Sequence, residues 1–156
     1  MLQRIISLPD SPDESFFLWG PRQTGKSSLL KNLYLEKGHV KYIDLLKSDV
    51  LVSYTNHPEH LRKELALESN PNLVIIDEIQ KVPSLLDEVH WLIENTSHVF
   101  ILCGSSARKL KRGQANLLGG RALRYELFCF VYPEIRKIFD LEHVINNGLI
   151  PRHYLG

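Results

Sequence analysis

Short apolar runs alternate with stretches of helical periodicity along this chain. The pattern predicts five strands, at 15–19, 40–45, 73–76, 99–103 and 121–130. Uninterrupted runs of branched side chains, such as 73–76, are typical of parallel strands that are covered on both faces. Strands separated by helix-sized intervals predict an α/β fold with a parallel sheet, whose carboxyl ends share one edge and form the ligand-binding side.

The intervening stretches predict the helices of this fold. A helix is expected over 26–37, with Gly38 as its C-terminal cap, and another begins with Pro58 in its first turn. A third helix opens at Pro83 and Ser84 and carries one apolar stripe, made of Leu85, Leu86, Val89, Leu92 and Ile93. Short helices are predicted over 133–139 and 141–147, with a turn over 148–151, whereas 48–54 is ambiguous.

A glycine-rich loop follows the first predicted strand. Residues 20–27 read Gly-Pro-Arg-Gln-Thr-Gly-Lys-Ser and match the pattern G-x-x-x-x-G-K-[S/T]. Gly20 and Gly25 allow a tight turn that points backbone N–H groups at phosphate oxygens, and the next helix presents its positive end to the same anion. Lys26 then reaches the β- and γ-phosphates, while the Ser27 hydroxyl is a Mg²⁺ ligand. The predicted nucleotide-binding residues are Gly20, Pro21, Arg22, Gln23, Thr24, Gly25, Lys26, Ser27 and Ser28.

Two acidic residues end the third predicted strand. Asp77 follows four apolar residues, where a carboxylate helps to hold Mg²⁺ opposite Ser27. Glu78 suits a different role, because a neighbouring carboxylate can orient and partly deprotonate the water that attacks the γ-phosphorus. A small-molecule kinase with the same loop would not need this glutamate, so the pair favours hydrolysis. The plain alternative, two charged residues that merely close a strand, is disfavoured by the loop at 20–27.

Further polar positions lie near the later strand ends. Ser105 ends the fourth strand and is predicted to touch the γ-phosphate or the attacking water, with Ser106 as the alternative. The segment between Gly104 and Tyr125 has no acidic residue and six basic ones, Arg108, Lys109, Lys111, Arg112, Arg121 and Arg124. Residues 108–112 either contact nucleic-acid phosphates or form a solvated loop. Arg121 is a candidate for stabilising charge on the γ-phosphate, in its own site or in that of a neighbouring subunit.

Composition adds limits rather than functions. The 156 residues suffice for one domain, and a net charge of +1 gives no global field that would favour nucleic acid or a membrane. No apolar run approaches the ~18 residues of a membrane span, and the N-terminus lacks a signal-peptide pattern, so a cytoplasmic location is expected. Cys103 and Cys129 are interpreted as reduced thiols. The seven histidines show no metal-binding pattern, and His57 and His60 are interpreted as surface residues.

Several of these strings together resemble one protein family across almost the whole chain. They are Gly-Pro-Arg-Gln-Thr-Gly-Lys-Ser (20–27), Ile-Ile-Asp-Glu-Ile-Gln-Lys-Val-Pro (75–83), Gly-Ser-Ser-Ala-Arg-Lys-Leu (104–110), Gly-Gly-Arg-Ala (119–122) and Tyr-Pro-Glu-Ile (132–135). In this order and at this spacing they resemble the predicted AAA+-superfamily ATPases of bacteria and archaea.

The resemblance implies a P-loop NTPase three-layer sandwich with a five-stranded parallel sheet in the order 5-1-4-3-2. It also implies roles for single residues: Walker A for Lys26 and Ser27, Walker B for Asp77 and Glu78, sensor 1 for Ser105 and arginine finger for Arg121. Gln80 belongs to the family string without an evident physical role.

The chain departs from this family pattern in two places. Relatives usually continue into a winged-helix-like region and a C-terminal domain that resembles restriction endonucleases, whereas this sequence stops soon after 149–151. The resemblance therefore implies an ATPase core over 1–132 and the start of a truncated helical lid over 133–156. Cys129 and Phe130 replace a proline-containing strand end, which affects local packing more than chemistry.

The function that the sequence predicts is ATP binding and Mg²⁺-dependent ATP hydrolysis. Expected partners are ATP and either further copies of the chain or a partner protein, with nucleic acid supported only by 108–112. The alternative is a nucleotide-dependent switch or interaction module that does not hydrolyse ATP.

Overall fold

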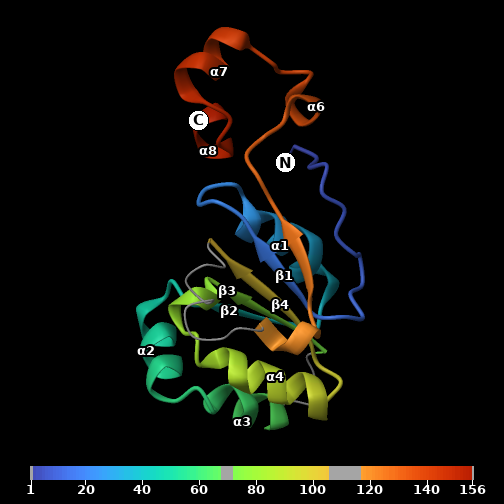
Figure 1. Cartoon of the computed structure of the whole chain (residues 1–156), viewed down its shortest axis with the longest axis vertical. Helices are drawn as coiled ribbons and strands as arrows, with labels where there is room; N and C mark the ends of the chain where they lie inside the picture. Colours follow the sequence, from blue (N-terminus) through green and yellow to red (C-terminus); the bar gives the residue numbers. More distant parts are fainter. Residues whose placement is uncertain (1, 68–71, 106–116, 156) are drawn as a thin grey trace.

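A five-stranded parallel sheet forms the centre of the molecule (Figure 1). The structure is a computed structural model that describes residues 2–67, 72–105 and 117–155. The strands follow the order β2-β3-β4-β1-β5, which confirms the predicted order 5-1-4-3-2. Their bounds are Phe16–Trp19 (β1), Val40–Asp44 (β2), Leu73–Asp77 (β3), Val99–Gly104 (β4) and Leu123–Glu126 (β5).

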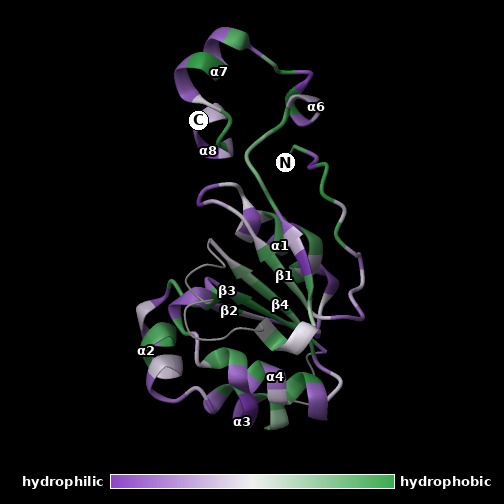
Figure 2. Ribbon diagram, in the orientation of Figure 1, coloured by the Kyte–Doolittle hydropathy of each residue, from purple (hydrophilic) through white to green (hydrophobic). Residues whose placement is uncertain are grey.

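The strand register brings the chemical residues to one edge of this sheet. In β2, β3 and β4, Asp44 lies beside Asp77, and Asp77 lies beside Cys103. Trp19, the last residue of β1, pairs with Gly104 of β4, so the loop at Gly20 begins where the other strands end. The apolar interiors of these strands form the green centre of Figure 2 and leave polar groups to the edge.

Helices cover both faces of the sheet. Helix α1 (Lys26–Tyr34) packs Leu30 and Tyr34 on one face, together with part of the N-terminal segment. The opposite face is covered by α2 (Ser48–Asn56), α3 (His60–Leu67) and α4 (Leu85–Asn95), which share one buried core with Ile76 and Leu102. The result is the expected three-layer sandwich (Figure 1).

Some element bounds differ from the sequence-based expectation. The ambiguous stretch at 48–54 is helical, within α2. The first helix is α-helical only to Tyr34 and ends in a 3₁₀ turn, Leu35–Lys37, before Gly38 with a φ of 74°. The last strand is shorter than 121–130, because the chain leaves the sheet after Leu127, whose N–H donates to the carbonyl of Trp19.

A small helical segment lies beyond the carboxyl edge of the sheet. It contains α6 (Tyr132–Ile135), α7 (Leu141–Asn147) and α8 (Pro151–Tyr154), so the expected turn at 148–151 leads into a helix. A separate core joins Phe130, Ile135 and Tyr154 to Leu2, which explains why the N-terminus lies beside this segment in Figure 1. No helix in the described part of the chain has the length and apolar character needed to cross a bilayer.

Candidate functional site

The loop between β1 and α1 is shaped by two glycines. A Cβ at Gly20 would lie 2.0 Å from the carbonyl oxygen of Leu127, so only glycine fits between the loop and the last strand. Gly25 has a φ of 89° and immediately precedes α1. No side chain among the described residues caps the first turn of α1 at this point. The positive end of the helix is therefore open to an anionic ligand.

Lys26 is held inside this loop. Its side chain is buried, with 6% exposure, and its Nζ donates to the carbonyl oxygens of Gly20 at 2.8 Å and Pro21 at 2.7 Å. Thr24 Oγ1 also donates to the Pro21 carbonyl, at 2.9 Å. These carbonyl groups carry no net charge, so they do not neutralise the ammonium. The loop therefore keeps a positive centre that an anion can use.

Asp77 presents a buried carboxylate at the end of β3. It is 2% exposed, and its Oδ2 accepts a 2.6 Å hydrogen bond from the hydroxyl of Tyr42 on β2. Burial, followed by this hydrogen bond and the nearby negative charge, raises the pKa of Tyr42, so the phenol remains a donor. Oδ1 is buried and has no hydrogen-bond partner among the described residues. A buried, unpartnered carboxylate oxygen is a suitable ligand for a hard cation.

Charges from the loop and from the strand ends meet around Cys103. Burial raises the pKa of this thiol, Asp77 and Glu78 raise it further, and Lys26 acts in the opposite direction. Geometry agrees with this, because Asp77 lies beside Cys103 in the strand register and Lys26 and Glu78 line one cavity. The thiol is buried and protonated and does not take part in a disulfide.

Glu78 turns out of the strand line immediately after Asp77. Its backbone is left-handed, with φ 60° and ψ 41°, an uncommon conformation for a residue with a side chain. Gln80 Nε2 donates both to Glu78 Oε2 and to Ser105 Oγ, the latter at 3.2 Å. The ends of β3 and β4 are thereby joined through side chains.

A cavity of about 580 Å³ lies over the glycine-rich loop, within the size range of small-ligand sites. Glu78 and loop residues 22–28 line one side of it. The opposite side is formed by the N-terminal and C-terminal segments, through Leu2, Arg4, Phe130, Pro151, Arg152 and Leu155. Gly20 and Pro21 are not among the residues that line the cavity, and their carbonyls accept hydrogen bonds from Lys26.

Arg121 is not brought to this cavity. It precedes β5, and the first residue of β5, Leu123, pairs with Phe16 at the start of β1. Arg121 therefore lies at the amino edge of the sheet, opposite the loop at Gly20. Its guanidinium forms an ion pair with Glu94 of α4, at 2.7 Å. A role for Arg121 in the site of its own chain does not agree with this position.

The sequence analysis did not identify Arg4 and Tyr42 as residues that contact the site. It named Gln80 but not its bridging role. Arg4 and Tyr42 are distant in sequence from the residues that they contact, and neither belongs to a local pattern. Gln80 lay within a recognisable string, which was the only signal available. The alternative serine, Ser106, and the basic stretch 108–112 lie outside the described residues.

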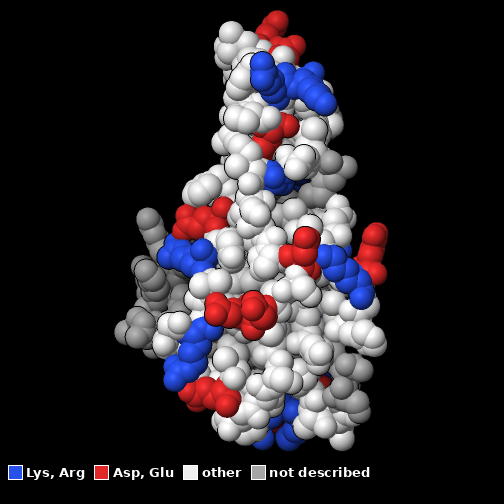
Figure 3. Space-filling model, turned by 90° about the vertical axis from the view of Figure 1, so that its right-hand side faces the viewer, with Lys and Arg blue, Asp and Glu red and all other residues white. Residues whose placement is uncertain are grey.

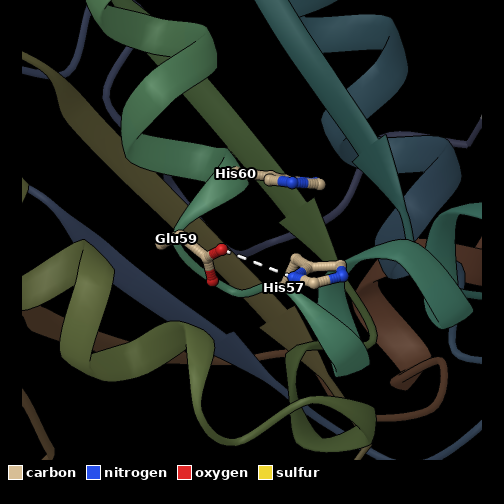
Figure 4. A group of neighbouring side chains, drawn as sticks. All are labelled: His57, Glu59 and His60. Atoms are coloured by element: carbon tan, nitrogen blue, oxygen red, sulfur yellow. Dashed lines mark ion pairs between the residues drawn. The ribbon is translucent and has the colours of Figure 1, made fainter.

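Two histidines and a glutamate gather between α2 and α3 (Figure 4). His57 Nδ1 lies 3.4 Å from Glu59 Oε1, and the rings of His57 and His60 stack with centroids 4.8 Å apart at an interplanar angle of 21°. Stacked imidazoles direct their in-plane nitrogen lone pairs along nearly parallel planes instead of at one point. One ligand atom from each of the three residues nevertheless lies within 4.8 Å of the others, with His57 exposed and Glu59 and His60 partly buried, so the interpretation as surface residues without a metal stays a prediction.

Comparison with known proteins places most of the chain in one family model. Residues 13–136 match the model described as AAA domain. The vacuolar protein sorting-associated protein 4B of Mus musculus and that of Pongo abelii are each 32% identical over 75 residues, which is 46% of this chain. The match spans 17% of the length of these curated relatives.

Solved structures share the fold at low sequence identity. The Aeropyrum pernix ORC2 protein in its ADP form superposes over 83% of this chain and 46% of its own, with a TM-score of 0.52 and 17% identity. The A. pernix ORC1 protein in complex with DNA covers 80% and 42%, with a TM-score of 0.53 and 16% identity. Domain III of the Thermotoga maritima replication initiation protein DnaA covers 80% and 58%, with a TM-score of 0.57 and 17% identity.

Proposed function

The chain belongs to the AAA domain family, and from this premise we propose that it binds ATP with Mg²⁺ and hydrolyses the γ-phosphate. The observation that carries the proposal is the convergence of loop residues 22–28 and Glu78 on one cavity, with Asp77 and Ser105 at the same sheet edge. In-line attack of water on the γ-phosphorus is the reaction class that these groups serve.

The chain's own residues would bind the triphosphate as follows. Backbone N–H groups of the 22–27 loop and the open end of α1 receive phosphate oxygens. The Nζ of Lys26 exchanges its two carbonyl acceptors for the β- and γ-phosphates, which carry the charge that those carbonyls lack. The apolar wall of the cavity, with Leu2, Phe130 and Leu155, is available for the base and sugar.

The residues at the strand ends fit a Mg²⁺ ion. Asp77 Oδ1, which has no hydrogen-bond partner in the described part of the chain, and the Ser27 hydroxyl are the oxygen donors that this ion prefers. Mg²⁺ held there would neutralise charge on the β- and γ-phosphates. Tyr42 donates a hydrogen bond to the other oxygen of Asp77, Oδ2. This hydrogen bond fixes the orientation of the carboxylate and leaves Oδ1 for the ion.

Glu78 is the residue that we assign to the attacking water. It lines the cavity, whereas Asp77 is engaged by Tyr42, so the two neighbouring carboxylates have different environments. A carboxylate in that position accepts a hydrogen bond from water and removes its proton as the new P–O bond forms. Ser105, bridged to Glu78 through Gln80, is assigned to the γ-phosphate or to the same water.

Two variants test this assignment. Lys26→Ala should abolish ATP binding in isothermal titration, because the loop loses the buried ammonium that we assign to the β- and γ-phosphates. Glu78→Gln should bind ATP within about twofold of the wild-type affinity while phosphate release falls about 10²–10³-fold. Chelation of Mg²⁺ with EDTA should stop phosphate release by the unmodified chain.

Matched substitutions on the surface serve as controls. Lys63→Ala and Glu142→Gln make the same chemical changes at exposed positions away from the cavity, and both should retain binding and turnover. Unchanged ATP affinity in Lys26→Ala would contradict the site. Tight ATP binding without phosphate release by the unmodified chain would instead support the nucleotide-dependent switch.

The organisation around this site is part of the proposal. We take residues 1–132 as the ATPase core and residues 133–156 as the start of a helical lid that covers the cavity. Because Arg121 lies at the far edge of the sheet, we assign it to the γ-phosphate of a neighbouring copy rather than to its own. Further copies of this chain are then the expected partner.

A further inference from the structure

The side chain of Gln80 connects the two residues that the proposed reaction needs at the γ-phosphate. Gln80 lies in the 3₁₀ turn Ile79–Lys81, directly after Glu78. Its amide nitrogen donates one hydrogen bond to Glu78 Oε2 and the other to Ser105 Oγ, at 3.2 Å. The two N–H bonds of one amide group therefore hold a carboxylate from the end of β3 and a hydroxyl from the end of β4.

The orientation of this amide is determined by its surroundings. With the opposite orientation, the carbonyl oxygen of Gln80 would face the carboxylate of Glu78, and two acceptors would meet without a proton. In the observed orientation Oε1 is buried and has no hydrogen-bond partner among the described residues. Burying an amide oxygen without a hydrogen-bond partner is unfavourable, so the two hydrogen bonds from Nε2 must stabilise this conformation of the Gln80 side chain.

Gly104 provides the space for this arrangement. A Cβ on Gly104 would lie 2.3 Å from Gln80 Oε1 and 2.5 Å from Trp19 Cζ3. The amide is thus enclosed between the end of β4 and an indole ring from β1. Little conformational freedom remains for the Gln80 side chain. Its two hydrogen bonds therefore restrict the side chains of Glu78 and Ser105.

We propose that Gln80 is a positioning residue that fixes the Glu78 carboxylate and the Ser105 hydroxyl in one arrangement for turnover. This inference rests on the proposed function of the site. Gln80 itself does not line the cavity, whereas Glu78 does, so Gln80 acts through its two neighbours and not on ATP. Glu78 has a left-handed backbone, which does not by itself select one rotamer for its side chain. A hydrogen bond from Gln80 is therefore needed to fix the direction of the Glu78 carboxylate.

The test compares turnover with binding in a Gln80→Leu chain. Leucine has a similar volume but no N–H donors, so Glu78 and Ser105 lose their common partner. Phosphate release at saturating ATP should fall at least about tenfold, because displacement of a catalytic group by about 1 Å costs up to 10²-fold. The dissociation constant for ATP should change less than about twofold, because the 22–28 loop is unaltered.

A double-mutant comparison separates positioning from general damage. In a Glu78→Gln background, Gln80→Leu should lower phosphate release by a smaller factor than in the wild-type background, because its effect through Glu78 is already lost and only its effect through Ser105 remains. Equal loss in both backgrounds would overturn the inference. Lys81→Leu, in the same 3₁₀ turn but exposed, is the matched control and should retain wild-type turnover.

The outcomes distinguish this inference from the function on which it rests. A wild-type chain that releases phosphate and a Gln80→Leu chain with the same rate overturn the positioning role alone. A wild-type chain without phosphate release overturns both proposals. A loss of ATP affinity in Gln80→Leu that equals the loss of turnover also counts against positioning, since it would indicate a damaged binding site.

Discussion

At the scale of single residues, the hydroxyl of Tyr42 is a hydrogen-bond donor to the buried carboxylate of Asp77. One carboxylate oxygen has this donor, at 2.6 Å, and the other has no hydrogen bond among the described residues. In Tyr42→Phe the buried Oδ2 would lose this phenol donor. Such a loss costs roughly 1–3 kcal/mol of the free energy of unfolding, which urea denaturation measures. Phenylalanine keeps the ring volume, so a change in packing does not explain the loss.

The destabilisation caused by Tyr42→Phe should depend on whether Mg²⁺ and ATP are present. If Asp77 holds Mg²⁺, saturating Mg²⁺ and ATP supply the missing partner and should reduce the difference between Tyr42→Phe and wild type. Tyr132→Phe is the matched control, because Tyr132 is exposed on α6 and its change should stay within about 0.5 kcal/mol. A destabilisation of Tyr42→Phe that is equal with and without the ligands would argue against a metal-binding role for Asp77.

At the scale of elements, Arg4 joins the N-terminal segment to the glycine-rich loop and to the C-terminal segment. Its guanidinium donates to Glu134 Oε1 at 3.0 Å, to the Thr24 carbonyl at 2.8 Å and to the Phe128 carbonyl at 2.7 Å. It also lies over the Phe130 ring, 5.0 Å from its centroid. Both Arg4 and Glu134 have side chains only 4% exposed. The loop that we assign to phosphate binding is therefore tied to α6 through one side chain.

Removal of Arg4 should affect both stability and nucleotide binding. In Arg4→Ala the buried Glu134 loses its cation, which costs about 3–5 kcal/mol when one partner of a buried pair is removed. The Thr24 carbonyl loses its donor as well, so ATP affinity should fall. Arg124→Ala is the matched control, because its ion pair with Glu126 is exposed and contributes about 0–1 kcal/mol. Equal unfolding midpoints for the two variants would contradict this prediction.

The Arg4 contribution should also depend on pH. Burial raises the pKa of Glu134, but the Ile5 N–H, the Arg4 side chain and the Val131 N–H together outweigh it, so the pKa lies below its ordinary value of 4.5. A lowered pKa means that the stabilisation is complete above pH 4.5 and is lost as the pH falls through the pKa of the folded state. The difference in unfolding free energy between wild type and Arg4→Ala should therefore shrink in acid. Urea titrations on both sides of pH 4.5 measure it.

Elements were predictable where a local pattern specified them. The glycines around α1 and the apolar stripe of α4 are readable from neighbouring residues, and continuous apolar runs identify β3 and β4. The end of β5 was not readable, because the chain leaves the sheet at Leu127 to meet Arg4, more than a hundred residues away. Helix α8 is only four residues long and is stabilised by Tyr154 in the third core, which no periodicity indicates.

The residues of the candidate site also divide into those that a local sequence pattern identifies and those that only tertiary contacts bring to the site. The loop at 20–27 and the pair Asp77 and Glu78 have fixed local spacing, and parallel topology then brings them to one edge. Tyr42 and Arg4 reach the site only through tertiary contacts, so their roles needed coordinates. Arg121 was recognisable as a residue, but its distance from the cavity depends on the register of β5.

At the scale of the whole molecule, the two edges of the sheet carry different groups. The cavity lies at the carboxyl edge and Arg121 at the amino edge, separated by at least the length of β1, about 13 Å for four residues. The face in Figure 3 mixes acidic and basic side chains, and no continuous basic patch is seen among the described residues on that face.

If Arg121 serves the cavity of a neighbouring copy, two defective chains should restore each other. Lys26→Ala retains Arg121 but lacks a working cavity, whereas Arg121→Ala retains the cavity but lacks the arginine that stabilises the γ-phosphate. Each chain alone should release phosphate at least about 10²-fold more slowly than wild type. In an equimolar mixture, roughly one interface in four pairs an intact cavity with an intact Arg121, so about a quarter of the wild-type rate should return.

The controls for this mixture follow from the position of Arg121. Arg124→Ala, on the adjacent strand β5, should be fully active alone, because its exposed side chain pairs with Glu126 and not with Glu94. Glu94→Gln frees Arg121 from its 2.7 Å ion pair and should leave turnover unchanged or raised, since the arginine must leave Glu94 to reach a neighbouring phosphate. A mixture that stays as inactive as its components, or an Arg121→Ala chain with the wild-type rate, would show that the arginine does not act between copies.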